Sequence, residues 1–156
     1  MADTTPPKRI LVVGGPNLNL FGRRQPEIYG TVTLKQIHEQ VTKEAERLGF
    51  DCICFQSNHE GAVLDFLHEN IDNAQGALLN PAGLTQYSPS LFDALKAMPF
   101  PVIEVHLSNL YAREAWRGHS IISAAARGVV QGFGWYGYIV ALYGLVGLIN
   151  EVQPEV

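Results

Sequence analysis

The sequence predicts an α/β fold built around a parallel sheet of five strands. Five short apolar runs alternate along the chain with segments whose apolar residues recur at helical spacing, an order typical of strands joined by crossover helices. The runs are mainly apolar and show no regular polar alternation, which is expected when helices cover both faces of the sheet. With 156 residues, the chain favours a flavodoxin-like three-layer arrangement over the longer dinucleotide-binding fold.

The predicted strands are short, and a turn or a polar segment follows most of them. They are Ile10–Val13, Cys52–Gln56, Ala77–Asn80, Val102–His106 and Gly128–Gly132. In an open parallel sheet the carboxyl ends of the strands share one edge, where ligands bind. We therefore expect a functional site among the residues that follow the strands.

The first helix has the clearest boundaries. Thr33 and Gln36 form a capping box at its start, in which each side chain bonds the backbone N–H of the other residue. Apolar residues recur at helical spacing from Leu34 to Leu48, and Gly49 supplies the stop. These features predict a helix between the cap and the glycine.

Four further helical segments complete the pattern. One is expected near 61–70, and another follows Ser88 as its cap, with Pro89 in the first turn. The last two are expected near 120–126 and over 135–149. Together with the strands they predict right-handed crossovers that place helices on both faces of the sheet.

One uncharged segment raises the question of a membrane. Residues 132–149 carry no charge and are long enough to span a bilayer. Glycines interrupt the segment, and the end of a buried strand followed by a buried helix accounts for its composition. We therefore expect no membrane span.

Composition indicates one domain over residues 1–156, with 1–8 as a flexible lead and 9–150 as the α/β domain. The net charge of −4 argues against nucleic-acid binding, which needs a basic face. The polar start lacks the apolar core of a signal peptide. Cys52 and Cys54 lie two apart in one predicted strand, so we expect free thiols on one face and a reducing compartment, the cytoplasm.

The loop after the first strand combines two arginines with a tyrosine. Arg23 and Arg24 precede Tyr29 in this loop, and a nearby cation favours the charged form of a phenol. Gly22 and Gly30 bracket the segment, and glycines permit backbone changes that let a loop close over a site. The loop therefore suggests a phenolate base, although a surface loop with scattered charges explains the same residues.

Polar residues follow three of the predicted strands and converge on one edge. The set comprises Asn17, Arg24, Tyr29, Asn80, Gln86, Glu104, His106, Ser108, Asn109, Arg113 and Arg117. Arginine pairs with carboxylates, amides and hydroxyls bind hydroxyl groups, and histidine exchanges a proton near neutral pH. The combination suits a small, anionic, hydroxylated substrate, whereas any one of these residues alone is more often structural.

Several other chemistries lack their motifs. The sequence contains no Gly-x-Ser-x-Gly, no Walker phosphate loop and no Gly-x-Gly-x-x-Gly after the first strand. Its five histidines lack a metal-ligand spacing, and its four lysines lie in the lead or on predicted helix surfaces. We expect neither a metal nor a cofactor.

Five ordered motifs resemble those of type II 3-dehydroquinate dehydratases, from about residue 10 to residue 150. The matching segments are Gly15-Pro-Asn-Leu-Asn-Leu-Phe-Gly, Arg24-Gln-Pro-Glu-Ile-Tyr-Gly30, Gln56-Ser-Asn-His-Glu-Gly61, Ile103-Glu-Val-His-Leu-Ser-Asn109 and Ala112-Arg-Glu with Arg117. The resemblance implies an anti elimination of water from 3-dehydroquinate to 3-dehydroshikimate through an enolate, without metal or cofactor. Residues 9–150 would then form the catalytic domain.

The resemblance also implies roles for individual residues. Tyr29 corresponds to the base that removes the proton beside the ketone, and Arg24 stabilises charge near it. Asn17 corresponds to a residue that holds a water at the enolate oxygen, and His106 to the acid that protonates the departing hydroxyl.

Substrate-binding positions and assembly follow from the same resemblance. Asn80, Leu107, Ser108 and Arg117 match positions that bind the substrate, with Arg117 on its carboxylate. Asp93 matches an acidic residue that a neighbouring subunit contributes. The implied assembly is a homo-oligomer, a dodecamer made of four trimers.

One departure from the family pattern affects the site. The family has Asn-x-Gly-x-x-Thr-His-Thr-Ser after the third strand, whereas this chain has Asn80-Pro-Ala-Gly-Leu-Thr-Gln-Tyr-Ser88. Gln86 therefore replaces a histidine that contacts the substrate; it keeps a donor and an acceptor but cannot carry a proton. Two interpretations stay open: an active dehydratase, or a catalytically altered paralogue that binds a related ring acid.

A third interpretation is a flavodoxin-like electron-transfer module. Such a protein would be yellow with bound flavin, and the arginine-rich loop after the first strand argues against it. For a dehydratase, both aromatic biosynthesis and quinate breakdown remain compatible with the sequence.

Overall fold

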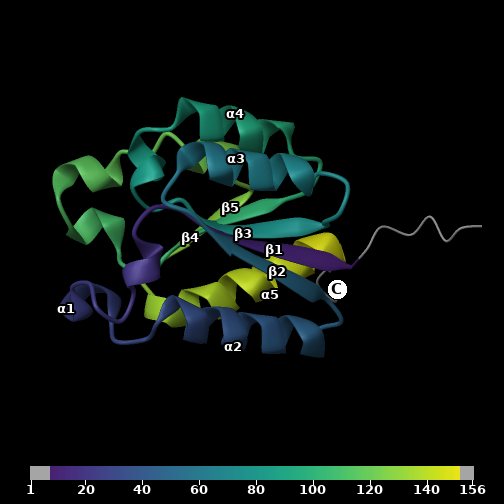
Figure 1. The fold of residues 1–156 in the computed structure, drawn as a ribbon, viewed down its shortest axis with the longest axis horizontal. Helices are drawn as coiled ribbons and strands as arrows, with labels where there is room; N and C mark the ends of the chain where they lie inside the picture. Colours follow the sequence, from purple (N-terminus) through teal and green to yellow (C-terminus); the bar gives the residue numbers. More distant parts are fainter. Residues whose placement is uncertain (1–7, 152–156) are drawn as a thin grey trace, which may run out of the picture.

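A five-stranded parallel sheet lies between two layers of helices in the computed structural model, which describes residues 8–151 (Figure 1). The strands are β1 (Arg9–Gly14), β2 (Asp51–Gln56), β3 (Gly76–Asn80), β4 (Val102–His106) and β5 (Gly128–Gln131). Their order is β2-β1-β3-β4-β5, and every pair is parallel. This is the flavodoxin-like order, so the predicted fold class is confirmed. Apart from Lys8, the predicted lead lies outside the described residues.

Two helices cover each face of the sheet. The helices are α1 (Pro26–Tyr29), α2 (Leu34–Arg47), α3 (Glu60–Glu69), α4 (Pro89–Ala97) and α5 (Gly137–Ile149). Helices α2 and α5 pack on one face and α3 and α4 on the other, while the short α1 lies at one end of the sheet (Figure 1). The three-layer arrangement therefore matches the prediction.

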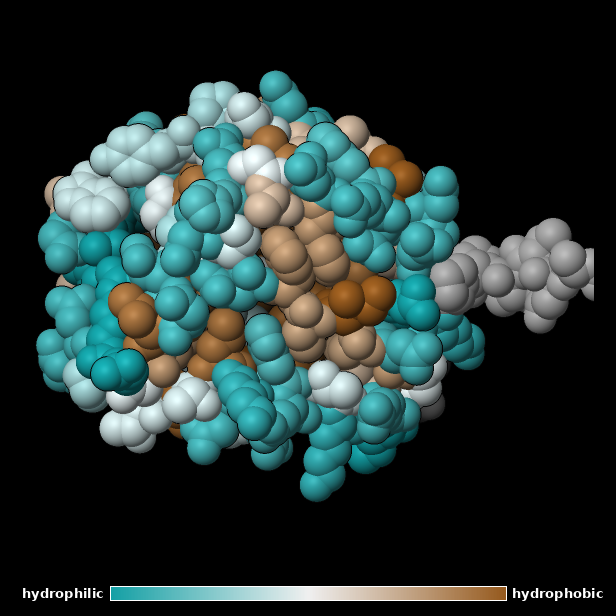
Figure 2. All heavy atoms as spheres, in the orientation of Figure 1, coloured by the Kyte–Doolittle hydropathy of each residue, from teal (hydrophilic) through white to brown (hydrophobic). Residues whose placement is uncertain are grey.

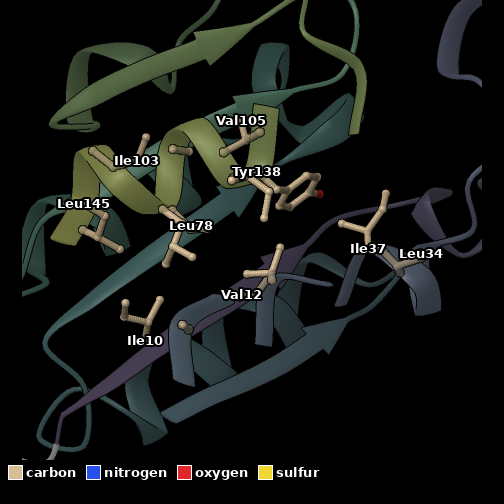
Figure 3. Close-up of a cluster of buried hydrophobic side chains, with 14 of the residues drawn as sticks. Ile10, Val12, Leu34, Ile37, Leu78, Ile103, Val105, Tyr138 and Leu145 are labelled. Atoms are coloured by element: carbon tan, nitrogen blue, oxygen red, sulfur yellow. The ribbon is translucent and has the colours of Figure 1, made fainter. Parts of the chain in front are cut away.

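Alternating side chains of β1 supply both halves of the core. Ile10 and Val12 point toward α2 and α5, where they join Leu78, Tyr138 and other buried residues (Figure 3). Leu11 and Val13 belong to the cluster on the opposite face. Successive side chains of a strand point to opposite faces, so one apolar run serves two layers. Burial on both faces explains why the central strands show no polar alternation.

The capping box of α2 forms as predicted. The backbone N–H of Thr33 donates to Gln36 Oε1 at 2.9 Å, and the backbone N–H of Gln36 donates to Thr33 Oγ1 at 3.2 Å. These bonds satisfy two donors that a helix start leaves free. The cap fixes where α2 begins, a few residues after α1, which ends at Tyr29.

The short helix predicted near 120–126 is shorter than expected and is not an α-helix. Only a short 3-10 helix, Ser123–Ala125, occurs there. The hydroxyl oxygen of Ser120 accepts the backbone N–H groups of Ile122 and Ser123, both at 3.0 Å. Such local side-chain bonds offer the backbone an alternative to helix formation. The segment therefore forms a tight turn that leads into β5.

The last helix begins later than predicted and is less completely buried. A 3-10 turn, Gly134–Tyr136, precedes α5. Large apolar or aromatic side chains along the outer side of this region are partly exposed: Tyr136, Val140, Tyr143 and Leu148. Within residues 8–151, no helix combines the length and apolar character needed to cross a membrane.

Strand β2 lies at the edge of the sheet and is only half-buried. In the orientation of Figure 1, apolar side chains show between α3 and α2, over this edge (Figure 2). Cys52 and Cys54 are free thiols in β2. Burial raises the pKa of Cys52 to about 12 and also raises that of Cys54. Both thiols are therefore protonated at neutral pH and poorly reactive.

Gly15 joins the ends of β1 and β3. Its backbone N–H donates to the carbonyl of Asn80 at 2.9 Å. A Cβ atom on Gly15 would lie 2.4 Å from the carbonyl oxygen of Pro81. Because that neighbour is backbone, it cannot move aside as a flexible side chain could. A residue without a side chain is thus required where the two strand ends meet.

We expect Gly15→Ala to lower the free energy of unfolding by about 1–3 kcal/mol, the usual cost of overpacking. Thermal unfolding followed by circular dichroism measures the change. Gly61→Ala is the matched control, because no atom lies within 4 Å of its added Cβ and alanine suits a helix better than glycine. Equal melting temperatures for the two variants would contradict the assigned contact.

Candidate active site

A cavity of about 190 Å³ opens where β1, β3 and β4 end. Nine of the ten predicted site residues line it: Asn17, Arg24, Tyr29, Asn80, Gln86, His106, Leu107, Ser108 and Arg117. They come from four separate segments of the chain. The shared edge of a parallel sheet explains their convergence.

Asp93 is the predicted site residue that does not line the cavity. It is exposed on α4. Within one subunit it therefore has no place at the site. The role implied by the resemblance requires a neighbouring subunit to present it.

Two guanidinium groups lie close to the ring of Tyr29. The guanidinium carbon of Arg24 is 4.9 Å from the centre of the Tyr29 ring, and that of Arg113 is 5.1 Å from it. Phe21 packs on the same ring, with 5.5 Å between ring centres. Both contacts have the geometry of a cation–π interaction with the Tyr29 ring.

Arg113 is a site residue absent from the predicted catalytic and binding set. Its Nη1 donates to Ser108 Oγ at 3.2 Å. Its Nε and Nη2 are buried and have no hydrogen-bond partner among the described residues. Buried polar groups are normally paired, and the Arg113 guanidinium also forms an ion pair with Glu114, with 4.0 Å between Nε and Oε2. The sequence placed Arg113 on the same edge, but only the contact with Tyr29 distinguishes it from a surface arginine.

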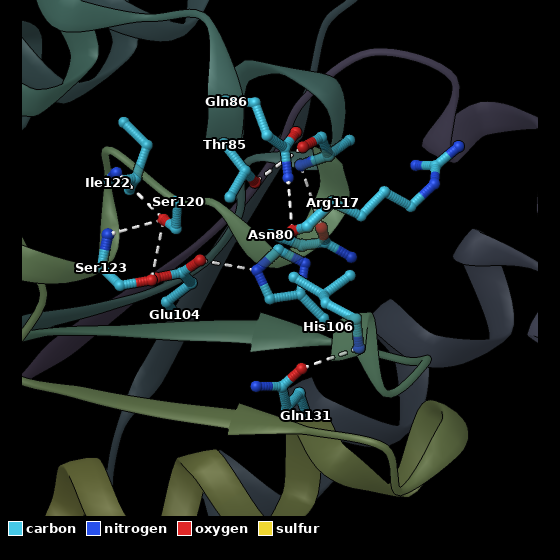
Figure 4. Close-up of polar contacts among 12 residues, drawn as sticks. Asn80, Thr85, Gln86, Glu104, His106, Arg117, Ser120, Ile122, Ser123 and Gln131 are labelled. Carbon is cyan, nitrogen blue, oxygen red and sulfur yellow. Dashed lines mark hydrogen bonds and ion pairs between the residues drawn. The ribbon is translucent and has the colours of Figure 1, made fainter. Parts of the chain in front are cut away.

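His106 ends β4 and is held by a buried carboxylate. His106 Nε2 lies 2.6 Å from Glu104 Oε1 (Figure 4). Glu104 is fully buried, and His106 is 5% exposed. Residues two apart in a strand point to the same side, which is why the pair can meet. With one ring nitrogen bound to Glu104, Nδ1 remains for a substrate.

Glu104 is therefore a second site residue absent from the predicted catalytic and binding set, although the sequence placed it among the polar residues at this edge. In the sequence it stands inside an apolar strand run, two residues before His106. A charged residue at a strand position buried on both faces needs a partner. The spacing of two residues between Glu104 and His106 was the sequence feature that indicated this pair.

Asn17 and Asn80 are held in fixed conformations. The backbone N–H of Asn17 donates to Asn58 Oδ1 at 2.9 Å, and Asn80 Oδ1 accepts the backbone N–H of Ala82 at 3.1 Å. Asn17 and Ala82 have φ angles of 70° and 51°, in the left-handed region that costs energy for residues with a Cβ. Strained backbone of this kind concentrates at functional sites. Ala82 stands where the family pattern has glycine.

Gln86 lines the cavity, and one end of its side-chain amide is fixed by a hydrogen bond. Its Nε2 donates to the backbone carbonyl of Arg117 at 2.9 Å (Figure 4). Its Oε1 is buried and has no hydrogen-bond partner among the described residues. The side chain thus ties the segment after β3 to the segment that carries Arg117.

The charges around the cavity are mainly positive. Arg24, Arg113 and Arg117 line it, and Arg117 pairs through Nε with the exposed Glu114. Neighbouring Arg117 lowers the pKa of Glu114. Within residues 8–151, no group of three His, Cys, Asp or Glu side chains could hold a metal ion. The geometry suits a small anion flanked by one phenol and one imidazole.

Comparison with known proteins identifies the family that this chain resembles. The sequence profile described as Dehydroquinase class II matches residues 8–146. A 3-dehydroquinate dehydratase from Halothermothrix orenii is 47% identical over 143 residues, which are 92% of this chain and 97% of that protein. Another from Herpetosiphon aurantiacus is 48% identical over 134 residues, 86% of this chain and 93% of that protein.

A solved structure agrees with the sequence comparison. The type II dehydroquinase from Propionibacterium acnes superposes with a TM-score of 0.86 at 38% identity, covering 90% of this chain and 97% of that one. The chain belongs to the class II dehydroquinase family.

Proposed function

We propose that this protein is a type II 3-dehydroquinate dehydratase, which eliminates water from 3-dehydroquinate to give 3-dehydroshikimate. The observation that carries the proposal is one cavity that holds both a phenol with two guanidinium groups close to its ring and an imidazole on a buried carboxylate. Its relatives' names support the same activity. Neither a metal nor a cofactor takes part in the proposed reaction.

Tyr29 acts as the base in this proposal. Its phenolate takes the proton from the carbon beside the ketone, and the electron pair moves onto the ketone oxygen as an enolate. Arg24 and Arg113 stabilise the phenolate, since both guanidinium groups face the ring. Asn17 helps to hold a water at the enolate oxygen, where a positioned dipole stabilises developing charge.

His106 acts as the acid in the second step. Its imidazolium gives a proton to the departing hydroxyl as the C–O bond breaks, so water leaves and the enolate becomes the conjugated enone. Glu104 stabilises the imidazolium at 2.6 Å. Substrate contacts are proposed for Asn80, Gln86, Leu107, Ser108 and Arg117, with Arg117 on the carboxylate.

An ultraviolet assay tests the activity directly. The purified protein should generate the absorbance of a conjugated enone from 3-dehydroquinate. A catalytically altered paralogue would bind a substrate analogue and form no enone; the relatives named as dehydratases do not favour that alternative. Membership of the dehydroquinase family likewise removes support for an electron-transfer module.

Tyr29→Phe removes the proposed base while keeping the ring packed on Phe21. We expect kcat to fall at least ~10²-fold, the lower end for the loss of general-base catalysis. Steady-state kinetics with 3-dehydroquinate measures the fall. Tyr87→Phe is the matched control, because Tyr87 is 73% exposed and does not line the cavity. Near-normal turnover of Tyr29→Phe would remove this residue from the role.

Gln86→His tests the departure from the family pattern. We expect a modest rise in activity, about 2- to 13-fold, because one neutral hydrogen bond contributes about 0.5–1.5 kcal/mol. The change should appear mainly in KM if the bond is equally strong in ground and transition states. If the natural chain is inert and Gln86→His creates dehydratase activity, the paralogue interpretation replaces the proposal.

A homo-oligomer, most simply a dodecamer of four trimers, completes the proposal. The partly exposed outer side of α5 and the exposed Asp93 support it, because apolar surface and a distant acidic site residue both call for a neighbouring copy. Light scattering should give a mass well above the 17.2 kDa chain. A fully active monomer would contradict both the assembly and the role of Asp93.

Residues 9–150 are proposed to act as a single catalytic domain in the cytoplasm. The support is one continuous sheet with a shared core and two free thiols. Cell fractionation with an antibody to the protein checks the compartment. Recovery outside the cytoplasm would refute it.

A further inference from the structure

Both oxygens of the buried Glu104 carboxylate have a partner. Oε1 lies 2.6 Å from His106 Nε2, and Oε2 accepts the hydroxyl of Ser123 at 2.7 Å (Figure 4). Glu104 has no exposed surface. A carboxylate removed from water is costly unless hydrogen bonds satisfy its oxygens. Ser123 therefore binds the carboxylate oxygen of Glu104 that does not contact His106.

The direction of these hydrogen bonds follows from proton counting. An ionised carboxylate only accepts, so the single proton of the Ser123 hydroxyl points to Glu104. Ser123 Oγ also lies 2.8 Å from Ser120 Oγ. The Ser123 hydroxyl therefore lies between the Glu104 carboxylate and the Ser120 side chain.

The turn itself does not depend on the Ser123 hydroxyl. Ser120 Oγ accepts the backbone N–H groups that shape the turn, from Ile122 and Ser123. Ile122 is fully buried and anchors the turn in the core. The backbone N–H of Ile121 donates to the carbonyl of Thr85 at 3.0 Å. The position of Ser123 is thus set by its neighbours, which leaves its hydroxyl free to serve the carboxylate.

A second cavity lies behind the acid pair. It has a volume of about 120 Å³, and Glu104, Ser120, Ser123 and Gln131 are among its lining residues. Without the Ser123 hydroxyl, the carboxylate could turn toward water in this cavity. Its other oxygen would then lose its alignment with His106. A substitution that removes the Ser123 hydroxyl should therefore slow proton transfer from His106 without abolishing it.

We propose that Ser123 is a positioning residue for the acid step: it fixes the Glu104 carboxylate so that Oε1 stays on His106 Nε2. This inference rests on the proposed function. Glu104 takes no proton in the step; His106 gives its own to the departing oxygen, which leaves with the electron pair of the broken C–O bond. Ser123 acts only through the carboxylate that stabilises the imidazolium.

Ser123→Ala should lower kcat on the order of 10- to 100-fold, the range expected for losing a hydrogen bond to a charged group, and leave KM within about 2-fold. Ser123→Thr keeps the hydroxyl and should restore most of kcat. Ser90→Ala, an exposed position on α4, is the matched control and should behave as wild type. Unchanged kcat in Ser123→Ala would overturn the inference.

A double-mutant cycle separates positioning from general structural support. In a His106→Ala background, adding Ser123→Ala should cause no further loss, because the path through the acid is already gone. Multiplied losses, or a Ser123→Ala chain that no longer folds, would show a structural role and refute the inference. A wild-type protein that forms no enone would refute the proposed function instead, so the two failures are distinguishable.

Discussion

The parallel register of the sheet is the constraint on which the site depends. Gly14 at the end of β1 pairs with Asn80 at the end of β3, and His106 at the end of β4 pairs with Gln131 of β5. These pairings bring loop residues from distant parts of the chain to one edge, as open α/β sheets do. Backbone contact at Gly15 draws the first two segments together. The cavity exists because these strand ends are level.

Charge is distributed unevenly between the cavity and the rest of the chain. The chain carries a net charge of −4, yet three arginines line the cavity. Glu104, the one buried carboxylate among residues 8–151, lies behind the imidazole and faces it. In the proposed reaction this arrangement separates the tasks: cations near Tyr29 stabilise negative charge, and an anion near His106 stabilises positive charge. In this proposal the phenol of Tyr29 acts as a base and the imidazole of His106 as an acid within one small site.

The segment after β3 combines strain with a changed side chain. Ala82 adopts a left-handed conformation at a position where the family pattern has glycine, and Asn80 holds its backbone N–H. Four residues later, Gln86 bonds the carbonyl of Arg117. Its amide therefore has a role within the fold as well as at the cavity. That double role explains how a glutamine can occupy the position without leaving a gap in the wall of the site.

Local sequence patterns were sufficient for much of this protein. Continuous apolar runs, the capping box at Thr33 and Gln36, and ordered motifs predicted the strands, the first helix and the family, because periodicity and capping act over a few neighbouring residues. Contacts between distant segments were beyond such patterns: Arg113 over Tyr29, Gln86 on Arg117, and Ser123 on Glu104. The length of the short helix near 120–126 was also beyond such patterns, because Ser120 Oγ accepts backbone N–H groups that shape a turn there. These interactions join side chains whose meeting depends on strand register and loop path, and a short window of sequence contains neither.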